Sequence, residues 1–277
     1  MLETRDLTIR FGGHVAVDQV SCRFPAGTLT AIVGPNGAGK TTYFNLISGQ
    51  LPASGGQVLL DGQDVGHLPA PLRTRRGLGR AFQLTQLFPG LTVRENLRLA
   101  VQAREAGRGR GGPLGGLDVW RVWRDRRDWI DEAQALLEQV RLGARAEAPA
   151  ASLPHGDQRK LEVAMLMALD PKVYLFDEPT AGMSVDEVPV VLDLIRGLKA
   201  RRDIAILLVE HKMDVVRELA DRLVVLHHGA LVAEGDPATV IASPVVQQAY
   251  LGLAPAADGE AAAASSSSSS TSPEVPA

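Results

Sequence analysis

The sequence predicts an α/β fold in which a parallel β-sheet is covered by helices. Short, continuous apolar runs of the buried-strand type alternate with segments that repeat apolar side chains at helical spacing, which is typical of such folds. The strand-like runs are Val173–Phe176, Ile204–Val209 and Leu223–Leu226, and the helical segments are 128–142 and 157–169. A chain of 277 residues is long enough for one large domain or two modest ones.

A glycine-rich loop follows the first strand-like run. Leu29–Val33 is apolar and β-rich, and residues 41–48 are expected to form the first turns of a helix. The loop between them fits the phosphate-binding pattern G-x-x-x-x-G-K-[ST]. Its residues are Gly34, Pro35, Asn36, Gly37, Ala38, Gly39, Lys40, Thr41 and Thr42. A glycine-rich turn that happens to precede Lys-Thr is the alternative, and the strand and helix on either side favour nucleotide binding.

The chemistry of this loop points to a nucleoside triphosphate with a metal ion. Glycines let successive main-chain N–H groups point at a phosphate chain, at the positive end of the helix dipole. Lys40 supplies a positive charge to the β- and γ-phosphates, and the Thr41 hydroxyl can coordinate Mg²⁺. We therefore expect Lys40 to act in catalysis as well as in binding.

The middle of the chain, residues 84–162, is expected to be almost all helix and loop, as an inserted helical subdomain. Arg98–Asp128 holds eight arginines against four acidic residues. A flexible loop that leads into a solvated helix is the favoured interpretation of this segment, and a dedicated docking patch is the alternative.

Polar side chains follow two of the strand-like runs. Asp177 and Glu178 come directly after Val173–Phe176, so that Asp177 can hold Mg²⁺ and Glu178 can polarise an attacking water. His211, after Ile204–Val209, can hydrogen-bond the γ-phosphate. Gln83 carries an amide suited to a Mg²⁺ or water contact. Taken singly, His211 would more often be a surface histidine at the start of a helix, and Gln83 is undecided.

Composition and the pattern of apolar segments argue against a membrane-spanning, a secreted and a disulfide-rich protein. Hydrophobic residues make up 45% and charged residues 22%, as in ordinary globular proteins. No apolar run approaches the ~20 residues that span a bilayer, the first residues do not resemble a secretory signal, and Cys22 is a single cysteine. We therefore expect a cytoplasmic protein. The net charge of −3 argues against general nucleic-acid binding, and residues 254–277, rich in Ala, Ser and Pro, are expected to be a disordered tail.

In this order and spacing, the motifs resemble those of the ATP-binding-cassette (ABC) ATPases over residues 2–252. The resemblance implies a P-loop NTPase (RecA-like) fold with a mixed-sheet core, an antiparallel β subdomain and an inserted α-helical subdomain. It also implies ATP and Mg²⁺ as cofactors. The expected divisions are a core of residues 1–83 and 163–253, a helical subdomain of residues 84–162 and the tail of residues 254–277.

The resemblance adds further site residues. Phe11 falls where the family stacks an aromatic ring on adenine, with Val17 beside it, and Gln83 is the Q-loop residue. The signature segment, which faces the ATP of a partner cassette in the family, departs from Leu-Ser-Gly-Gly-Gln. It reads Leu153, Pro154, His155, Gly156 and Asp157. Pro154 lacks both the serine hydroxyl and an N–H donor, and Ser184 stands where the D-loop usually has aspartate.

The function that this resemblance implies is ATP hydrolysis that powers a membrane importer. Segments such as 11–17, 87–97, 178–183 and 209–214 resemble the larger cassette of branched-chain amino-acid importers. The implied partners are a second cassette, identical or different, a transmembrane permease and, indirectly, a solute-binding protein. The chain would lie on the inner face of the cell membrane. Cassettes for urea or short-amide uptake, for lipid or lipopolysaccharide export, and soluble ABC ATPases remain alternatives, because the solute is selected by other subunits.

Overall fold

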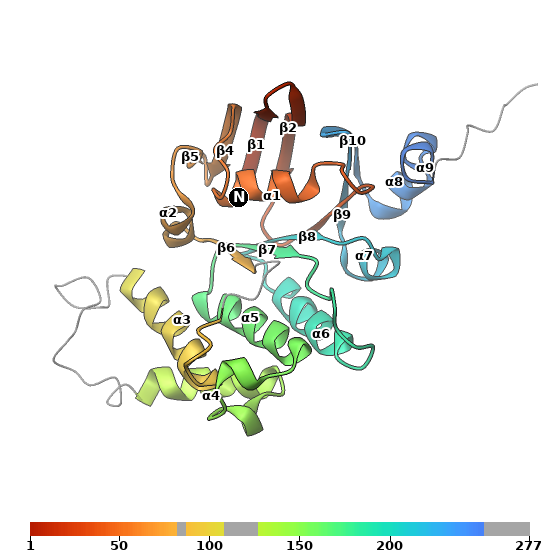
Figure 1. Cartoon of the computed structure of the whole chain (residues 1–277). Coiled ribbons are helices and arrows are strands. Elements are labelled where there is room, and N and C mark those ends of the chain that lie inside the picture. The colour runs from red at the N-terminus through yellow and green to blue at the C-terminus, as the bar shows by residue number, and fades with distance from the viewer. Residues whose placement is uncertain (82–86, 108–126, 252–277) are drawn as a thin grey trace, which may run out of the picture.

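A six-stranded mixed sheet lies at the centre of the fold (Figure 1). The computed structural model describes residues 1–81, 87–107 and 127–251. The strand order is β10-β9-β3-β8-β7-β6, and every pair is parallel except β9 with β10. The strands are β3 (Leu29–Val33), β6 (Leu78–Ala81), β7 (Val173–Asp177), β8 (Ala205–Val209), β9 (Arg222–His227) and β10 (Ala230–Gly235). The predicted α/β class and the mixed sheet are confirmed.

The central strands are continuous apolar runs because both faces of the sheet are covered. Side chains along a strand alternate between the two faces. In β7, Val173 and Leu175 belong to one buried cluster, whereas Tyr174 and Phe176 belong to another on the opposite face. A parallel sheet buried on both sides leaves no polar face, so its strands lack the polar alternation of a half-exposed strand.

A second, antiparallel sheet packs on one face through helix α1 (Lys40–Ser48). The order of its strands is β2-β1-β4-β5. They are β1 (Leu2–Phe11), β2 (His14–Phe24), β4 (Gly55–Leu60) and β5 (Gln63–Asp64). Helix α1 lies between the two sheets in Figure 1, and its Phe44 and Ile47 share a buried cluster with Leu7 and Leu175. This sheet corresponds to the expected antiparallel β subdomain.

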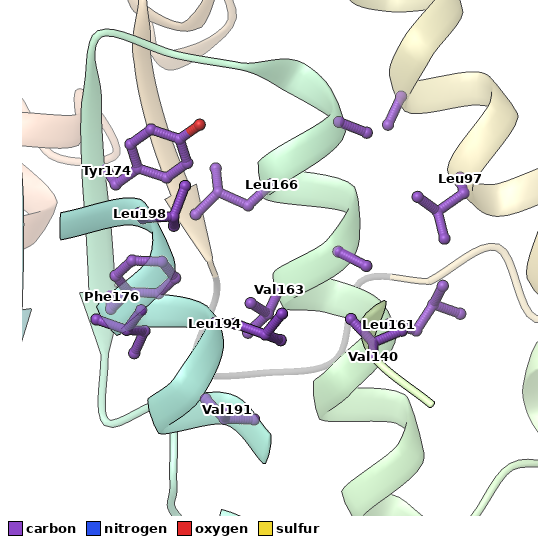
Figure 2. Close-up of a cluster of buried hydrophobic side chains, with 14 of the residues drawn as sticks. Leu97, Val140, Leu161, Val163, Leu166, Tyr174, Phe176, Val191, Leu194 and Leu198 are labelled. Atoms are coloured by element: carbon purple, nitrogen blue, oxygen red, sulfur yellow. The ribbon is translucent and has the colours of Figure 1, made fainter. Parts of the chain in front are cut away.

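Four helices lie on the opposite side of the central sheet (Figure 1). They are α3 (Val93–Gly107), α4 (Arg127–Gln139), α5 (His155–Leu169) and α6 (Val188–Lys199). Helices α5 and α6 lie next to the sheet, and α3 and α4 pack on α5. Figure 2 shows that α5 packs against two elements. Its Leu161 points toward Leu97 of α3, and its Leu166 lies beside Tyr174 of β7. The expected subdomain boundary between residues 162 and 163 therefore falls inside a continuous helix.

The remaining helices are shorter and peripheral. They are α2 (Ala70–Arg75), α7 (Met213–Leu219), α8 (Pro237–Ala242) and α9 (Pro244–Leu251). No helix formed by the described residues has the length and apolar character required to cross a membrane. Gln83, most of the arginine-rich segment and the tail of residues 254–277 lie outside the described residues, so the expectations for them stay predictions.

Candidate functional site

The glycine-rich loop connects β3 to α1 and opens at the N-terminus of that helix. Gly39, directly before the first helical residue Lys40, has a φ of 95°. A Cβ atom at Gly39 would lie 2.5 Å from the carbonyl oxygen of Ala16 in β2, so glycine is required at this approach. Asn36 and Thr41 are exposed at the mouth of the loop. The unpaired N–H groups of this helix end suit an anion such as phosphate.

The Lys40 side chain folds back over the loop. Its Nζ donates hydrogen bonds to the carbonyl oxygens of Gly34 at 2.7 Å and Pro35 at 3.0 Å. Burial lowers the pKa of Lys40, and the negative charges of Glu178 and Asp177 oppose that shift. The ammonium group is therefore within electrostatic reach of both carboxylates that end β7, although more than 130 residues separate them in sequence.

Asp177 is the last residue of β7 and is almost completely buried, with 2% exposure. Its Oδ2 accepts a hydrogen bond from Arg80 Nη2 at 2.7 Å. Its Oδ1 is buried and has no hydrogen-bond partner among the described residues. A buried carboxylate oxygen without a donor is costly unless something else binds it, and a cation is the natural occupant.

The available donors fit Mg²⁺. A carboxylate oxygen of Asp177 and the hydroxyl of Thr41 are hard oxygen ligands, which Mg²⁺ prefers, together with phosphate oxygens and water. Within the described ranges, no three His, Cys, Asp or Glu side chains cluster to hold a metal by themselves.

Glu178 and His211 lie at the ends of neighbouring strands. Glu178 has a φ of 48°, a conformation that few non-glycine residues adopt and that recurs at functional sites. Its N–H donates to the carbonyl oxygen of Val209 at 3.0 Å. His211 Nδ1 is 3.8 Å from Glu178 Oε1, and the two side chains are 55% and 29% exposed, respectively. Both groups are therefore accessible to solvent and to each other.

Glu210 is a site residue that the sequence reasoning missed. It is 1% exposed. Its Oε1 accepts from Thr180 Oγ1 at 2.6 Å, and its Oε2 accepts from the main-chain N–H groups of His211 at 2.9 Å and Lys212 at 3.2 Å. Glu210 thus ties the turn after Glu178 to the loop that carries His211. The signal was present, because a carboxylate follows an apolar strand here just as Asp177 does.

The signature segment begins α5. Pro154 is the residue that caps the helix N-terminus, and it forms no side-chain hydrogen bond there. Pro154 and His155 are exposed, whereas the side chain of Leu153 is buried in the hydrophobic core. The Asp157 carboxylate is paired within the chain, with Lys160 at 2.8 Å and Arg145 at 3.2 Å. The exposed part of the predicted signature is therefore limited to Pro154 and His155, at the N-terminus of α5.

An ion-pair chain joins the signature to Ser184. Lys160 Nζ lies 3.6 Å from Glu187 Oε1. Glu187 Oε2 accepts from the N–H of Ser184 at 3.2 Å and from its hydroxyl at 2.9 Å, and these bonds are the main reason that the pKa of Glu187 is lowered. The carboxylate lies so close to Gly156 that a Cβ atom there would be 2.1 Å from it. Two of the departures from the family pattern, Asp157 and Ser184, are thus connected in space through Lys160 and Glu187.

Phe11 and Val17 occupy different environments. Phe11 ends β1 and is 50% exposed, so its ring is available to a ligand. Val17 was expected beside the nucleotide, but its side chain has no exposed surface and packs under Gly39 of the glycine-rich loop. Val17 supports the loop from below. Gln83, the remaining predicted contact, lies outside the described residues.

Known proteins are similar in sequence to this chain over nearly its whole length. A family model described as "ABC transporter" matches residues 17–181. The branched-chain amino acid transport ATP-binding protein BraF of Pseudomonas aeruginosa is 37% identical over 252 residues, which span 91% of this chain and 98% of BraF. LivG of Escherichia coli K12, also described as a high-affinity branched-chain amino acid transport ATP-binding protein, has the same identity and coverage.

A solved structure has the same fold. The ADP conformation of MJ1267, described as an ATP-binding cassette of an ABC transporter, superposes with a TM-score of 0.75 at 29% sequence identity. The superposition covers 91% of this chain and 99% of MJ1267.

Proposed function

This chain belongs to the ABC transporter family, and we propose that it is the ATP-hydrolysing cassette of a membrane importer for branched-chain or related amino acids. The observation that carries the proposal is the similarity to BraF and LivG, which spans nearly their whole length. Within that span, the phosphate loop, the Asp177–Glu178 pair and His211 lie around one site.

The described side chains have distinct roles in this proposal. Main-chain N–H groups of the loop and Lys40 hold the phosphates. Mg²⁺, held by Thr41 and Asp177, would neutralise negative charge that develops on the β- and γ-phosphate oxygens. Glu178 polarises the attacking water, and His211 hydrogen-bonds the γ-phosphate. Gln83 completes the metal or water contacts.

A second cassette is the proposed partner across the signature. Pro154 and His155 are exposed at the N-terminus of α5, where a γ-phosphate from another subunit could approach. Val185, next to Ser184, is 87% exposed, more than any other large apolar side chain in the described part of the chain. These features support a composite site formed with an identical or a different cassette.

The proposed permease contact lies near Phe88, on the inner face of the membrane. Phe88 is 51% exposed. Its main chain is held by Asn96, which has no exposed surface, accepts from the Phe88 N–H at 2.8 Å and donates to its carbonyl oxygen at 3.1 Å. An apolar ring on a fixed loop suits a protein partner. Solute would reach that permease from a solute-binding protein, and no nucleic-acid partner is proposed.

Isolation of the membrane complex tests this function. The tagged chain is expressed in its native host, membranes are solubilised in detergent, and co-purifying proteins are identified by mass spectrometry. Uptake of labelled leucine is measured in parallel in cells that carry Lys40→Ala. A co-purified permease together with lost leucine uptake supports the proposal. Ribosomal or DNA-bound partners, or an exporter, would overturn it, and leucine uptake equal to wild type would overturn the branched-chain assignment.

Nucleotide affinity should fall when Phe11 is replaced by alanine. Stacking of a base on an aromatic ring contributes roughly 1–3 kcal/mol, and a phenyl ring offers no group that reads the base edge, so ATP and GTP should be affected alike. Equilibrium titration of both nucleotides checks this. Phe88→Ala, which removes an equally exposed ring from the segment before α3, is the control. Unchanged ATP affinity in Phe11→Ala would mean that the ring does not contact the base.

Pro154→Ser should raise both the stability of the chain and the ATPase activity of its homodimer. Serine is favoured at a helix N-terminal cap, where it stabilises by about 0.5–2 kcal/mol relative to alanine, which like proline offers no side-chain acceptor. Its hydroxyl can accept from a main-chain N–H while it donates to a γ-phosphate oxygen of the other subunit, a charge-assisted bond of roughly 1.5–3 kcal/mol.

Thermal unfolding and steady-state ATPase activity over a range of protein concentrations measure the two effects of Pro154→Ser separately. Ser184→Ala, which leaves the α5 cap unchanged, is the comparison variant. Higher stability with unchanged ATPase activity, at concentrations where both proteins dimerise, would show that Gly156 and the helix N-terminus suffice without a hydroxyl.

A further inference from the structure

Arg80 connects two parts of the nucleotide site although no motif marks it. It lies in β6, and its side chain is 6% exposed. Its Nη2 donates to Asp177 Oδ2 at 2.7 Å. Its Nη1 donates to Asn45 Oδ1 at 2.7 Å and Ser48 Oγ at 2.9 Å, both on α1, and to Gln50 Oε1 at 3.0 Å. One guanidinium group thus bridges the helix that follows the phosphate loop and the strand that ends in Asp177.

These contacts fix the orientation of the Asp177 carboxylate. One of its oxygens is occupied by Arg80, and the other is buried without a hydrogen-bond partner in the described part of the chain. We propose that Arg80 is a positioning residue, which holds Asp177 so that the free Oδ1 is presented to Mg²⁺. The proposal rests on the proposed function, because it requires Mg²⁺ to bind with ATP beside Asp177.

The Arg80 guanidinium is well suited to orient Asp177 because several neighbouring groups fix its own position. Its planar fork donates in directions fixed by its geometry, and it lies 5.6 Å from the ring centroid of Phe44, within the range of a cation–π contact. The same helix α1 carries Lys40 and Thr41. Arg80 therefore sets the position of Asp177 relative to the two loop residues that act on the same phosphates.

Loss of this contact should weaken the metal site more than the nucleotide site. Without Arg80 the buried Asp177 carboxylate loses its charged hydrogen-bond partner, and it is free to rotate toward water or main-chain N–H groups. Removal of a side chain that orients a metal ligand commonly costs roughly 10- to 100-fold in metal affinity or activity. Binding of nucleotide without metal depends on the phosphate loop and on Phe11. Arg80 donates its hydrogen bonds to other residues, namely Asn45, Ser48, Gln50 and Asp177.

The experiment measures metal affinity directly. Mn²⁺ replaces Mg²⁺ as a paramagnetic probe, and its binding to the purified full-length chain with a non-hydrolysable ATP analogue is followed by electron paramagnetic resonance. Affinity for the analogue in EDTA is measured separately. The variants are Arg80→Gln, Arg80→Lys and Arg73→Gln.

Arg73 is the matched control. It is also a buried arginine, with 2% exposure. Its guanidinium donates to main-chain carbonyl oxygens and to no residue of the proposed site. These acceptors are Leu46, Ile47, Gly66 and Leu68, at 2.6 to 2.8 Å. Arg73→Gln should lower the melting temperature and leave Mn²⁺ affinity unchanged.

Arg80→Gln should weaken Mn²⁺ binding by roughly 10- to 100-fold with unchanged analogue affinity in EDTA, and Arg80→Lys should lie between it and wild type. If Arg80→Gln binds Mn²⁺ like wild type, Arg80 is only a structural residue and the proposal fails. Should Arg80→Gln not fold, Arg80→Lys decides in the same way. Absence of protein-bound Mn²⁺ with the analogue in wild type would instead overturn the proposed function itself.

Discussion

Glu178→Gln is expected to remove most steady-state ATP hydrolysis while ATP binding persists. Glu178 is partly exposed at the end of β7, and its main chain is held by Val209. Asp177, the other carboxylate there, is buried against Arg80 and is not free to polarise water. Glutamine preserves the shape of the side chain but cannot accept a proton, and loss of a general base costs about 10²- to 10⁴-fold.

The test uses a complex with the partner cassette in which the partner's own site is disabled. Phosphate release and bound ATP are measured, and the Glu178→Gln complex should retain ATP in a closed dimer. Glu147→Gln, which removes a carboxylate that is 73% exposed on the helical side of the molecule, should hydrolyse ATP like wild type. Normal turnover in Glu178→Gln would assign the base to another group.

The parts of the fold that could be predicted from the sequence are those with a local cause. Leu29–Val33 and the run at Val173–Phe176 were recognisable because burial on both faces leaves an uninterrupted apolar run. The antiparallel sheet followed only from the family resemblance. Its strand β1 carries polar side chains and several register shifts, so its pattern does not stand out from the residues alone.

In the site, too, contiguous motifs could be predicted from the sequence and contacts between distant residues could not. The phosphate loop is contiguous, so its spacing alone identifies it. The bond between Arg80 and Asp177 joins residues 97 positions apart, and the bond between Thr180 and Glu210 joins residues 30 apart. No spacing rule relates such pairs, because the sheet topology brings them together only after the strands are ordered as β8-β7-β6. The burial of Val17 was also missed, because β2, which carries it, reaches the phosphate loop from the other sheet.

Glu210→Ala is expected to lower both stability and turnover. Removal of the carboxylate leaves three donors without an acceptor: the Thr180 hydroxyl and the main-chain N–H groups of His211 and Lys212. Thr180 is 1% exposed, so water does not readily replace that bond. Hydrogen bonds to charged groups contribute about 1.5–3 kcal/mol each and do not add fully, so we expect a loss of roughly 3 kcal/mol. For a domain of this size that corresponds to a melting temperature lower by about 5–10 °C.

Turnover should fall because the loop that carries His211 loses its anchor. The side chain of His211 is 55% exposed. Its main chain is held by the hydrogen bond from its own N–H to the Glu210 carboxylate. Thermal unfolding measures the first effect, and steady-state ATPase activity well below the new melting temperature measures the second. If the melting temperature falls but the activity per folded molecule does not, Glu210 stabilises the fold without positioning His211.

Glu210→Gln separates the charge from the hydrogen bonds. The amide oxygen can still accept from the two main-chain N–H groups, and the amide nitrogen can donate to the Thr180 hydroxyl oxygen. We therefore expect stability and turnover close to wild type, opposite to the outcome for Glu178→Gln one strand away. The same substitution has different effects at the two positions. Glu178 must accept a proton, which glutamine cannot do, whereas Glu210 needs only to keep its hydrogen bonds to Thr180, His211 and Lys212. A Glu210→Gln variant that folds normally but loses turnover would mean that its negative charge acts on His211 directly.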